Sequence, residues 1–232
     1  MLDDNCCINS YATFNLIIMC GRFASYKNLN KLKNIFNICN SDFITTQSYN
    51  ISPGQDVNIV LNYKLDNYLL SSNWGYNFID SKTKNNQKVI NSRIETINSK
   101  LLFKDSFLKR KCIIPANGYF EWSKKEGEKK PYYIQLGDGE LIFFAGVWRK
   151  EKYTNDKRRV FSIITKAANS NVNKIHHRMP IVLNANAAQN YLEIKDNNLN
   201  LDNFEDVDLK FTEVSKYVNS PKIMMKMYHS IN

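Results

Sequence analysis

The sequence contains no Cys-x-x-Cys pair, and its cysteines are an odd number, five. An odd count without a secretion signal favours reduced thiols in the cytoplasm. Two of the three histidines, His176 and His177, are adjacent, and the third is His229 near the end of the chain. Such an arrangement does not suit a zinc site, so we expect neither a metal nor another cofactor.

Long apolar runs are also missing, because no stretch reaches the length that a membrane-spanning helix needs. A signal peptide would begin with basic residues, whereas this chain has Asp3 and Asp4 and no Lys or Arg before Arg22. We therefore expect a protein that has no membrane partner.

Acidic residues are few compared with basic ones. The chain has 32 Lys and Arg against 22 Asp and Glu, a net charge of +10 and a pI near 9.3. This balance favours a polyanionic partner such as a nucleic acid, although a solvated lysine-rich surface would explain it equally well. The 232 residues contain no internal repeat and no long linker, which indicates one domain.

Apolar periodicity predicts a mixed architecture. Residues 27–38 and about 97–111 have helical spacing, and short β-branched or apolar runs predict strands between and after them. Because no repeating βαβ pattern occurs, we expect an α+β fold with a curved, mostly antiparallel, barrel-like sheet and flanking helices. The predicted strands are Val57–Tyr63, Cys112–Ile114, Tyr132–Leu136, Leu141–Trp148, Val160–Thr165 and Leu209–Val214.

Four short clusters place reactive or polar residues beside Gly, Pro or aromatic residues. Each has an ordinary explanation when it is taken alone: a packed cysteine, a turn asparagine, a solvated carboxylate or a structural histidine. The clusters are Met19–Phe23, Asn91–Thr96, Pro115–Trp122 and Ile175–Pro180.

Together, in this order, the clusters resemble the motifs of the SOS response-associated peptidase (SRAP) family, whose members sense abasic sites in DNA. The resemblance runs from Met19 to about Pro221 and implies the SRAP fold for residues 19–232, with residues 1–18 as an extension outside the family. Weaker matches are Tyr49–Pro53, Trp74-Gly75, Lys130–Tyr133, Phe144–Trp148, Thr165 with Ala168-Asn169, and Val218–Pro221.

The resemblance implies that Cys20 crosslinks to abasic sites in single-stranded DNA and so shields the lesion. The chemistry is consistent with this, because the α-amine of an N-terminal cysteine, with a pKa of about 8, condenses with an aldehyde and the thiol then closes a thiazolidine ring. An internal cysteine has only an amide nitrogen. We therefore expect either that translation begins at Met19, which is then removed, or that the upstream segment is cleaved.

The family motifs also imply roles for the other site residues. Glu121 is expected to be the general acid and base beside the Cys20 amine. His176, rather than His177, is expected to assist sugar opening and crosslink reversal. Asn91 is expected to hold the opened sugar, and Thr165 to add a nearby hydroxyl.

DNA contacts are expected from arginine and tryptophan side chains. Arg22 and Arg93 are the predicted phosphate clamps, and Arg178 is either a third clamp or part of an internal ion pair. Trp122 and Trp74 are predicted to stack on bases, with a core position as the alternative for Trp74. The residues after Trp74-Gly75 depart from the family's proline-containing loop, which weakens the expectation that this loop wedges between DNA strands.

Two other functions remain open at this point. One is a cysteine peptidase with an N-terminal nucleophile, which cleaves its own leader or another peptide, whereas possible lyase behaviour belongs to the DNA-crosslinking enzyme. The other is a noncovalent single-strand binder in which Cys20 is structural. In each case we expect a cytoplasmic monomer that joins the nucleoid when bound to damaged DNA.

Overall fold

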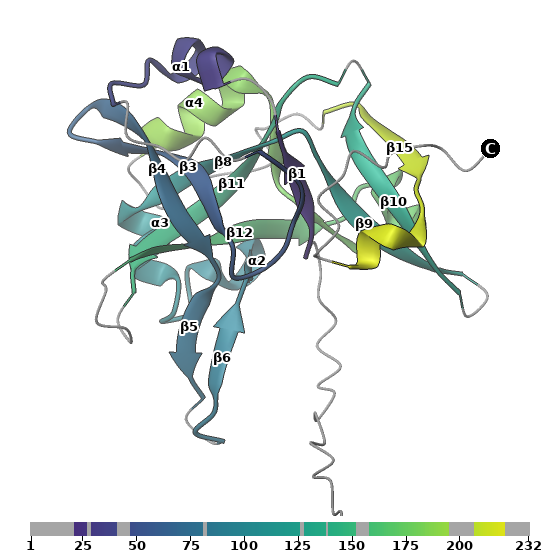
Figure 1. Ribbon diagram of the computed structural model, residues 1–232. Helices are drawn as coiled ribbons and strands as arrows, with labels where there is room; N and C mark the ends of the chain where they lie inside the picture. Colours follow the sequence, from purple (N-terminus) through teal and green to yellow (C-terminus); the bar gives the residue numbers. More distant parts are fainter. Residues whose placement is uncertain are drawn as a thin grey trace, which may run out of the picture.

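Strands from distant parts of the chain close into a ring at the centre of the fold (Figure 1). The computed structural model describes residues 21–26, 29–40, 47–80, 83–125, 128–137, 139–151, 158–194 and 207–220. Pairing runs from β12 to β4, β3, β8 and β11, and β11 pairs with β12 again. Closure leaves these strands without an open sheet edge. The ring strands are β3 (Asp56–Tyr63), β4 (Asp66–Trp74), β8 (Lys111–Ala116), β11 (Ile142–Lys150) and β12 (Arg159–Ala167).

Short strands extend the ring on both sides of β12 and β11. Strand β7 (Asn91–Arg93) pairs with β12 in parallel, and β13 (Arg178–Pro180) pairs with β12 antiparallel. Strand β14 (Val182–Leu183) adds to β11. With β12–β4 also parallel, the sheet is mixed rather than purely antiparallel.

A second, antiparallel sheet lies beside the barrel in the order β15-β10-β9-β1-β2. Figure 1 shows β9, β10 and β15 as a separate layer to the right of the ring. Asn117 alone separates β8 of the barrel from β9 of this sheet, so the two sheets are joined by one continuous segment. The strands are β1 (Phe23–Ser25), β2 (Ser48–Ile51), β9 (Gly118–Lys125), β10 (Glu128–Leu136) and β15 (Leu209–Glu213).

Helices cover the outside of the barrel, and a hairpin projects from it. Figure 1 places α1 and α4 together at one end, and the β5–β6 hairpin at the other. The helices are α1 (Leu29–Phe36), α2 (Ile94–Ile97), α3 (Lys104–Lys109) and α4 (Ala185–Glu193), the 3₁₀ turns are η1 (Val172–Lys174) and η3 (Lys216–Asn219), and the hairpin consists of β5 (Tyr76–Ile79) and β6 (Asn86–Val89).

The central strands are buried on both faces, which explains their nearly continuous apolar sequences. On β12, Phe161 and Ile163 pack into one core cluster, whereas Val160 and Ile164 on the opposite face pack into another. The second cluster also contains residues of α1 and α4, such as Phe36. The helices therefore cover one face of the barrel strands, while the other face packs with the second sheet.

The predicted α+β class is confirmed, and every strand predicted from the sequence is present. The first predicted helix is confirmed as α1 within its described residues. The single helix predicted over about 97–111 is wrong, because the chain forms α2, a turn and α3 before β8 starts at Lys111. Leu101, expected on the apolar face of that helix, is 94% exposed, so there is no continuous buried stripe.

Candidate functional site

The start of the described chain lies against β9, the strand that carries Glu121. Phe23 pairs with Tyr119 in the register of β1 and β9, and the backbone N–H of Phe120 donates to the carbonyl of Arg22 at 2.9 Å. Cys20 itself lies outside the described residues. Its sequence neighbours Gly21 and Arg22 are thus placed beside the segment that leads into Glu121.

Glu121 is a buried carboxylate, with 3% of its surface exposed. Its Oε1 accepts a hydrogen bond from the backbone N–H of Trp122 at 3.3 Å. Tyr132 on β10 lies directly opposite in the antiparallel register, so the two side chains are on the same face of the sheet. A carboxylate in such a position can exchange a proton with a neighbouring amine or thiol.

His176 follows η1 and is half-buried. Its backbone N–H donates to the carbonyl of Val172 at 2.9 Å, which fixes the turn. The ring Nδ1 lies 3.1 Å from both the backbone N and the backbone O of Arg178. The Arg178 N–H can donate to an unprotonated Nδ1, and the Arg178 carbonyl can accept from a protonated one. The Arg178 backbone therefore offers Nδ1 both a donor and an acceptor, and the tautomer of the imidazole decides which one is used.

Two of the motifs are brought together on opposite sides of β12. In parallel register, Asn91 pairs with Ile163 and Arg93 pairs with Thr165, and Thr165 also pairs with Pro180 on β13. The Asn91 and His176 motifs thus flank the same strand, β12, although they are distant in the sequence. Asn91 itself is half-buried at the start of β7.

Thr165 and Arg178 form a polar network that links these strands. Thr165 is fully buried, and its hydroxyl donates to the carbonyl of Ser92 at 3.4 Å. Arg178 Nη2 donates to the Thr165 carbonyl at 2.9 Å and to its hydroxyl at 3.3 Å. The guanidinium also forms an ion pair with Glu95, at 2.9 Å between Nη2 and Oε2. In this arrangement the Thr165 hydroxyl is internal and does not face a DNA strand.

The predicted phosphate clamps differ in how accessible they are. Arg93 is exposed at the end of β7. Arg22 is half-buried, and its Nη1 donates to Asn50 Oδ1 at 3.0 Å and to the Val218 carbonyl at 3.2 Å. Burial lowers the pKa of the Arg22 guanidinium from its ordinary value. For Arg178, the internal ion pair with Glu95 was the alternative to a phosphate contact, and it is the arrangement observed.

Trp74 is a core residue, which corrects the prediction that it stacks on bases. Its side chain has no exposed surface, lies parallel to the ring of Phe161 with centroids 6.3 Å apart, and packs edge-on against Phe23. Its Nε1 donates to the Ile90 carbonyl at 3.1 Å. Trp122 is partly exposed, and its Nε1 donates to Asn219 Oδ1 at 2.8 Å. Of these two tryptophans, only Trp122 retains a surface that a base could reach.

These motifs were compared with known proteins. The sequence model of the family described as SOS response associated peptidase (SRAP) matches residues 19–221. The chain belongs to the SRAP family. It is 31% identical over 219 residues to the abasic site processing protein YoqW of Bacillus subtilis, a match that covers 88% of this chain and 96% of that one. It is also 31% identical over 144 residues to the abasic site processing protein YedK of Escherichia coli, covering 62% and 64% of the two chains.

Solved structures agree on the SRAP fold. A crystal structure of a protein from Bacteroides thetaiotaomicron superposes with a TM-score of 0.73 at 22% identity and covers 87% of this chain and 96% of that one. A phage-related protein from Bordetella bronchiseptica superposes with a TM-score of 0.65 at 23% identity, covering 84% and 94%. At these identities the likeness concerns the fold alone.

Some SRAP residues with a clear structural role were not singled out individually from the sequence. Asn50 is 4% exposed, and its amide joins Arg22 to the C-terminal segment by donating to the carbonyls of Val218 and Ser220 at 3.3 and 2.9 Å. Asn219 holds Trp122. Both asparagines lie in the weaker family matches, but their partners become evident only after folding.

Within the described ranges, no group of three or more His, Cys, Asp or Glu side chains is arranged to hold a metal ion. No helix in the same part of the chain has the length and apolar character needed to cross a membrane.

Proposed function

We propose that this protein captures abasic sites in single-stranded DNA by forming a covalent bond through Cys20. The proposal is supported by membership of the SRAP family and by relatives that are named abasic site processing proteins. The structural observation that carries it is the 2.9 Å hydrogen bond from the Phe120 N–H to the Arg22 carbonyl. Arg22 follows Cys20 by two positions in the sequence, so this bond ties the described start of the chain to β9, the strand that carries the buried Glu121.

The reaction combines one aldehyde with one terminal cysteine and releases one water. The free α-amine of Cys20 adds to the aldehyde of the opened sugar and gives a carbinolamine, which loses water to form an imine. The thiol then adds to the imine carbon, and its proton passes to the nitrogen, closing the thiazolidine ring. Both groups belong to one residue, so the capture requires that Met19 and everything before it have been removed.

The neighbouring side chains have proton-transfer roles in this scheme. Glu121 gives a proton to the departing hydroxyl of the carbinolamine and takes one from the amine or the thiol. His176 exchanges protons with the sugar oxygen as the ring opens, while the Arg178 backbone at Nδ1 holds the imidazole in place. Asn91 orients the opened sugar. The role of each residue is a proposal that follows the family motifs.

The DNA strand is held by charge and by stacking. Arg93 is exposed and free to meet a phosphate, and Trp122 is partly exposed in the strand that carries Glu121. The excess of Lys and Arg favours binding to any single strand, and the aldehyde then selects the lesion. Bound in this way, the protein would shield the lesion from other reactions.

A second candidate is autoproteolysis by Cys20. The observation that favours it is the leader, because 18 residues precede Met19 and the thiol needs a free amine. Attack of the Cys20 thiol on the Met19 carbonyl would transfer the acyl group from nitrogen to sulfur and give a thioester. Water would then hydrolyse this thioester and release the leader through Met19, with Glu121 assisting the proton transfers. Intact-mass analysis of the full-length chain after expression tests this, with Glu121→Gln as the comparison. Equal processing of both forms would exclude Glu121 from the cleavage.

Capture is tested with protein that begins at Cys20 and a labelled single strand that carries one abasic site. On a denaturing gel we expect a retarded band. This band should be stable without reduction by borohydride. Cys20→Ala and an N-terminally acetylated protein should give no band. Cys20→Ser keeps the amine and should give a band mainly after borohydride reduction of the Schiff base.

The outcomes separate the functions that remain open. A shift on native gels alone would identify a noncovalent binder and exclude capture. A stable band with Cys20→Ala would show that another residue reacts. A tetrahydrofuran site, which has no aldehyde, is the matched DNA control and should give no band with any form of the protein.

A further inference from the structure

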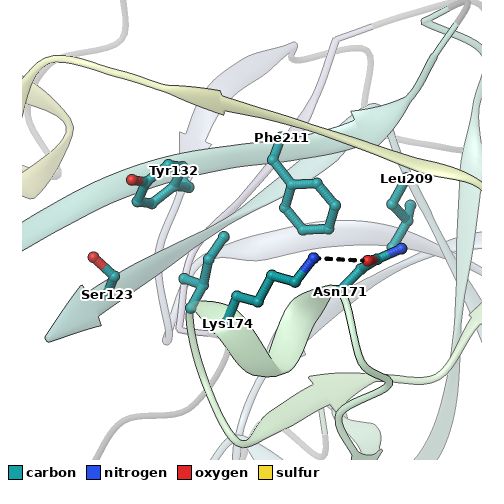
Figure 2. Close-up of a pocket in the computed structure, with 7 residues that line it drawn as sticks. Ser123, Tyr132, Asn171, Lys174, Leu209 and Phe211 are labelled. Atoms are coloured by element: carbon teal, nitrogen blue, oxygen red, sulfur yellow. Dashed lines mark hydrogen bonds between the residues drawn. The ribbon is translucent and has the colours of Figure 1, made fainter. Parts of the chain in front are cut away.

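A cavity of about 420 Å³ lies between the second sheet and the η1 turn (Figure 2). The sheet contributes Ser123 of β9, Tyr132 of β10, and Leu209 and Phe211 of β15. The opposite wall is made by Asn171, Lys174 and Ile175. Figure 2 shows the Phe211 ring pointing from β15 toward Lys174, whose amine lies 3.3 Å from Asn171 Oδ1.

The walls of this cavity are the immediate neighbours of the candidate catalytic residues. Ser123 follows Glu121 by two positions on β9, so both side chains are on the same face of the strand. Tyr132 lies directly opposite Glu121 in the register. On the other wall, Ile175 directly precedes His176. The cavity therefore adjoins the site but contains none of the residues assigned to the reaction.

The lining has flat apolar walls and a few polar groups. Tyr132 and Phe211 are partly exposed aromatic rings, and Leu209 and Ile175 add aliphatic surface. Ser123 is 3% exposed and adds a hydroxyl group to the lining. This combination is typical of small-molecule pockets, which have apolar walls and a few orienting polar groups.

Charge is distributed unevenly around the cavity. Lys174 supplies an exposed ammonium group on the η1 side. Two acidic groups adjoin the cavity on the sheet side: Glu121, opposite Tyr132 in the register, and Glu213, whose Oε2 lies 3.4 Å from the Tyr132 hydroxyl. A ligand with an aromatic face, a polar edge and a negative charge on the η1 side matches this arrangement.

We propose that this cavity receives an unstacked nucleobase from a nucleotide that flanks the lesion in the same strand. Tyr132 and Phe211 provide the stacking surface, Ser123 meets the edge of the base, and Lys174 meets its phosphate. This inference rests on the proposed capture of abasic sites, because it takes the DNA strand to pass Glu121 and His176. It adds a base-binding position outside the aldehyde chemistry.

The experiment uses protein that begins at Cys20 and a set of single strands with one abasic site each. In every strand one flanking nucleotide, at successive positions on either side, is replaced by tetrahydrofuran, which lacks both the base and the aldehyde. We expect loss of the base at one position to slow adduct formation about fivefold or more, which matches a stacking contribution of about 1 kcal/mol. Equal rates for all strands would overturn the proposal.

A variant of the cavity then assigns the effect to a residue. Phe211→Leu keeps apolar bulk but removes the ring. This variant should therefore react with the complete strand as slowly as the wild type reacts with the strand that lacks the critical base. When the variant meets that same base-lacking strand, the rate should fall no further. The control is Tyr63→Leu, because Tyr63 is an aromatic residue 57% exposed in the β3–β4 turn. A base effect that persists unchanged in Phe211→Leu would overturn the proposal.

A second variant covers the case in which Phe211→Leu does not fold. Lys174 is exposed, and Lys174→Gln should slow the reaction more at low salt than at high salt, whereas Lys64→Gln should not. If neither cavity variant changes the rate, the pocket does not bind DNA. If no strand gives an adduct, capture itself is wrong, and the base effect is then read from fluorescence anisotropy with the same strands.

Discussion

The side-chain oxygen of Asn50 accepts a hydrogen bond from the guanidinium of Arg22 at 3.0 Å. The amide nitrogen of the same side chain donates to the carbonyls of Val218 and Ser220. Asn50 thereby connects the residue two positions after Cys20 to the C-terminal end of the described chain. The start of β1 is thus held from the β9 side by Phe120 and from the other side by Asn50.

This connection predicts energetic coupling between the two residues. Asn50→Ala should lower the free energy of unfolding by about 1–3 kcal/mol, because it leaves buried polar groups without their partner. In the double variant with Arg22→Met the two losses should not add, since both remove the same hydrogen bond. Urea denaturation of the wild type, the single variants and the double variant measures the coupling. Simple additivity would show that the contact contributes nothing.

The two tryptophans should respond differently to substitution. Trp74→Ala should cost about 3–5 kcal/mol of stability, because it empties a fully buried position between Phe161 and Phe23. Trp122→Ala should cost less, because Trp122 is partly exposed, but it should weaken binding to single-stranded DNA. Chemical denaturation and fluorescence anisotropy separate the two effects. A similar loss of stability in both variants would contradict the assigned positions.

The ion pair of Glu95 with Arg178 predicts a pH-dependent contribution to stability. The hydrogen bond from Arg178 lowers the pKa of the Glu95 carboxyl in the folded state. The stabilisation is therefore complete above the ordinary carboxyl pKa of about 4.3 and is lost as the pH falls through the lowered folded-state value. Because the Glu95 side chain is 48% exposed, the ion pair should contribute less than about 1 kcal/mol to the free energy of unfolding.

Glu95→Gln tests this contribution directly. The wild type should be more stable than the variant at pH 7, and the difference should shrink toward zero as the pH approaches 3. The measurement is the free energy of unfolding at each pH. A difference that does not change with pH would mean that the carboxylate charge is not involved.

Salt dependence tests the DNA contacts of the arginines. If exposed Arg93 meets a phosphate, Arg93→Gln should make the dependence of binding on salt weaker. The magnitude of the negative slope of log affinity against log salt concentration should fall by about 0.7 for a single strand. Glu95→Gln should increase the magnitude of this slope, because Arg178 is released from its ion pair and can then meet a phosphate. Lys64→Gln is the control for a general loss of charge. An unchanged slope in Arg93→Gln would remove this residue from the interface.

Much of the local structure follows from the sequence because the strand signal is strong. Runs such as Val160–Thr165 are apolar on both faces, and these strands are indeed buried on both faces. Strand β4 was not predicted, since Asn and Ser interrupt its apolar residues. Helix α4 was not predicted either, because its buried face consists of Ala188, Tyr191 and Leu192, a weaker apolar signal than the Leu and Phe residues of α1. For α4, the evidence lies in the Asn184 side chain, which accepts from the Ala187 N–H at the helix start.

In the candidate site, too, local sequence motifs were predictable, whereas contacts between residues distant in the sequence were not. The motifs that contain Asn91, Glu121 and His176 were recognisable in the sequence, and β7 and β13 bring the first and last of them to opposite sides of β12. The core position of Trp74 and the internal pairing of Arg178 could not be decided from residue type, because each side chain suits both a DNA contact and an internal one.

The sequence alone determined the chemical possibilities of this protein: the residue types in the four motifs, the excess positive charge and the α+β alternation of apolar segments. Those properties depend on covalent structure and on neighbours a few positions away. Only the tertiary structure decided which arginines are exposed, which tryptophan is buried, and that Asn50 ties β1 to the C-terminal segment. Burial and hydrogen-bond pairing arise between residues that the chain separates by up to 196 positions, so they exist only after the sheets have formed.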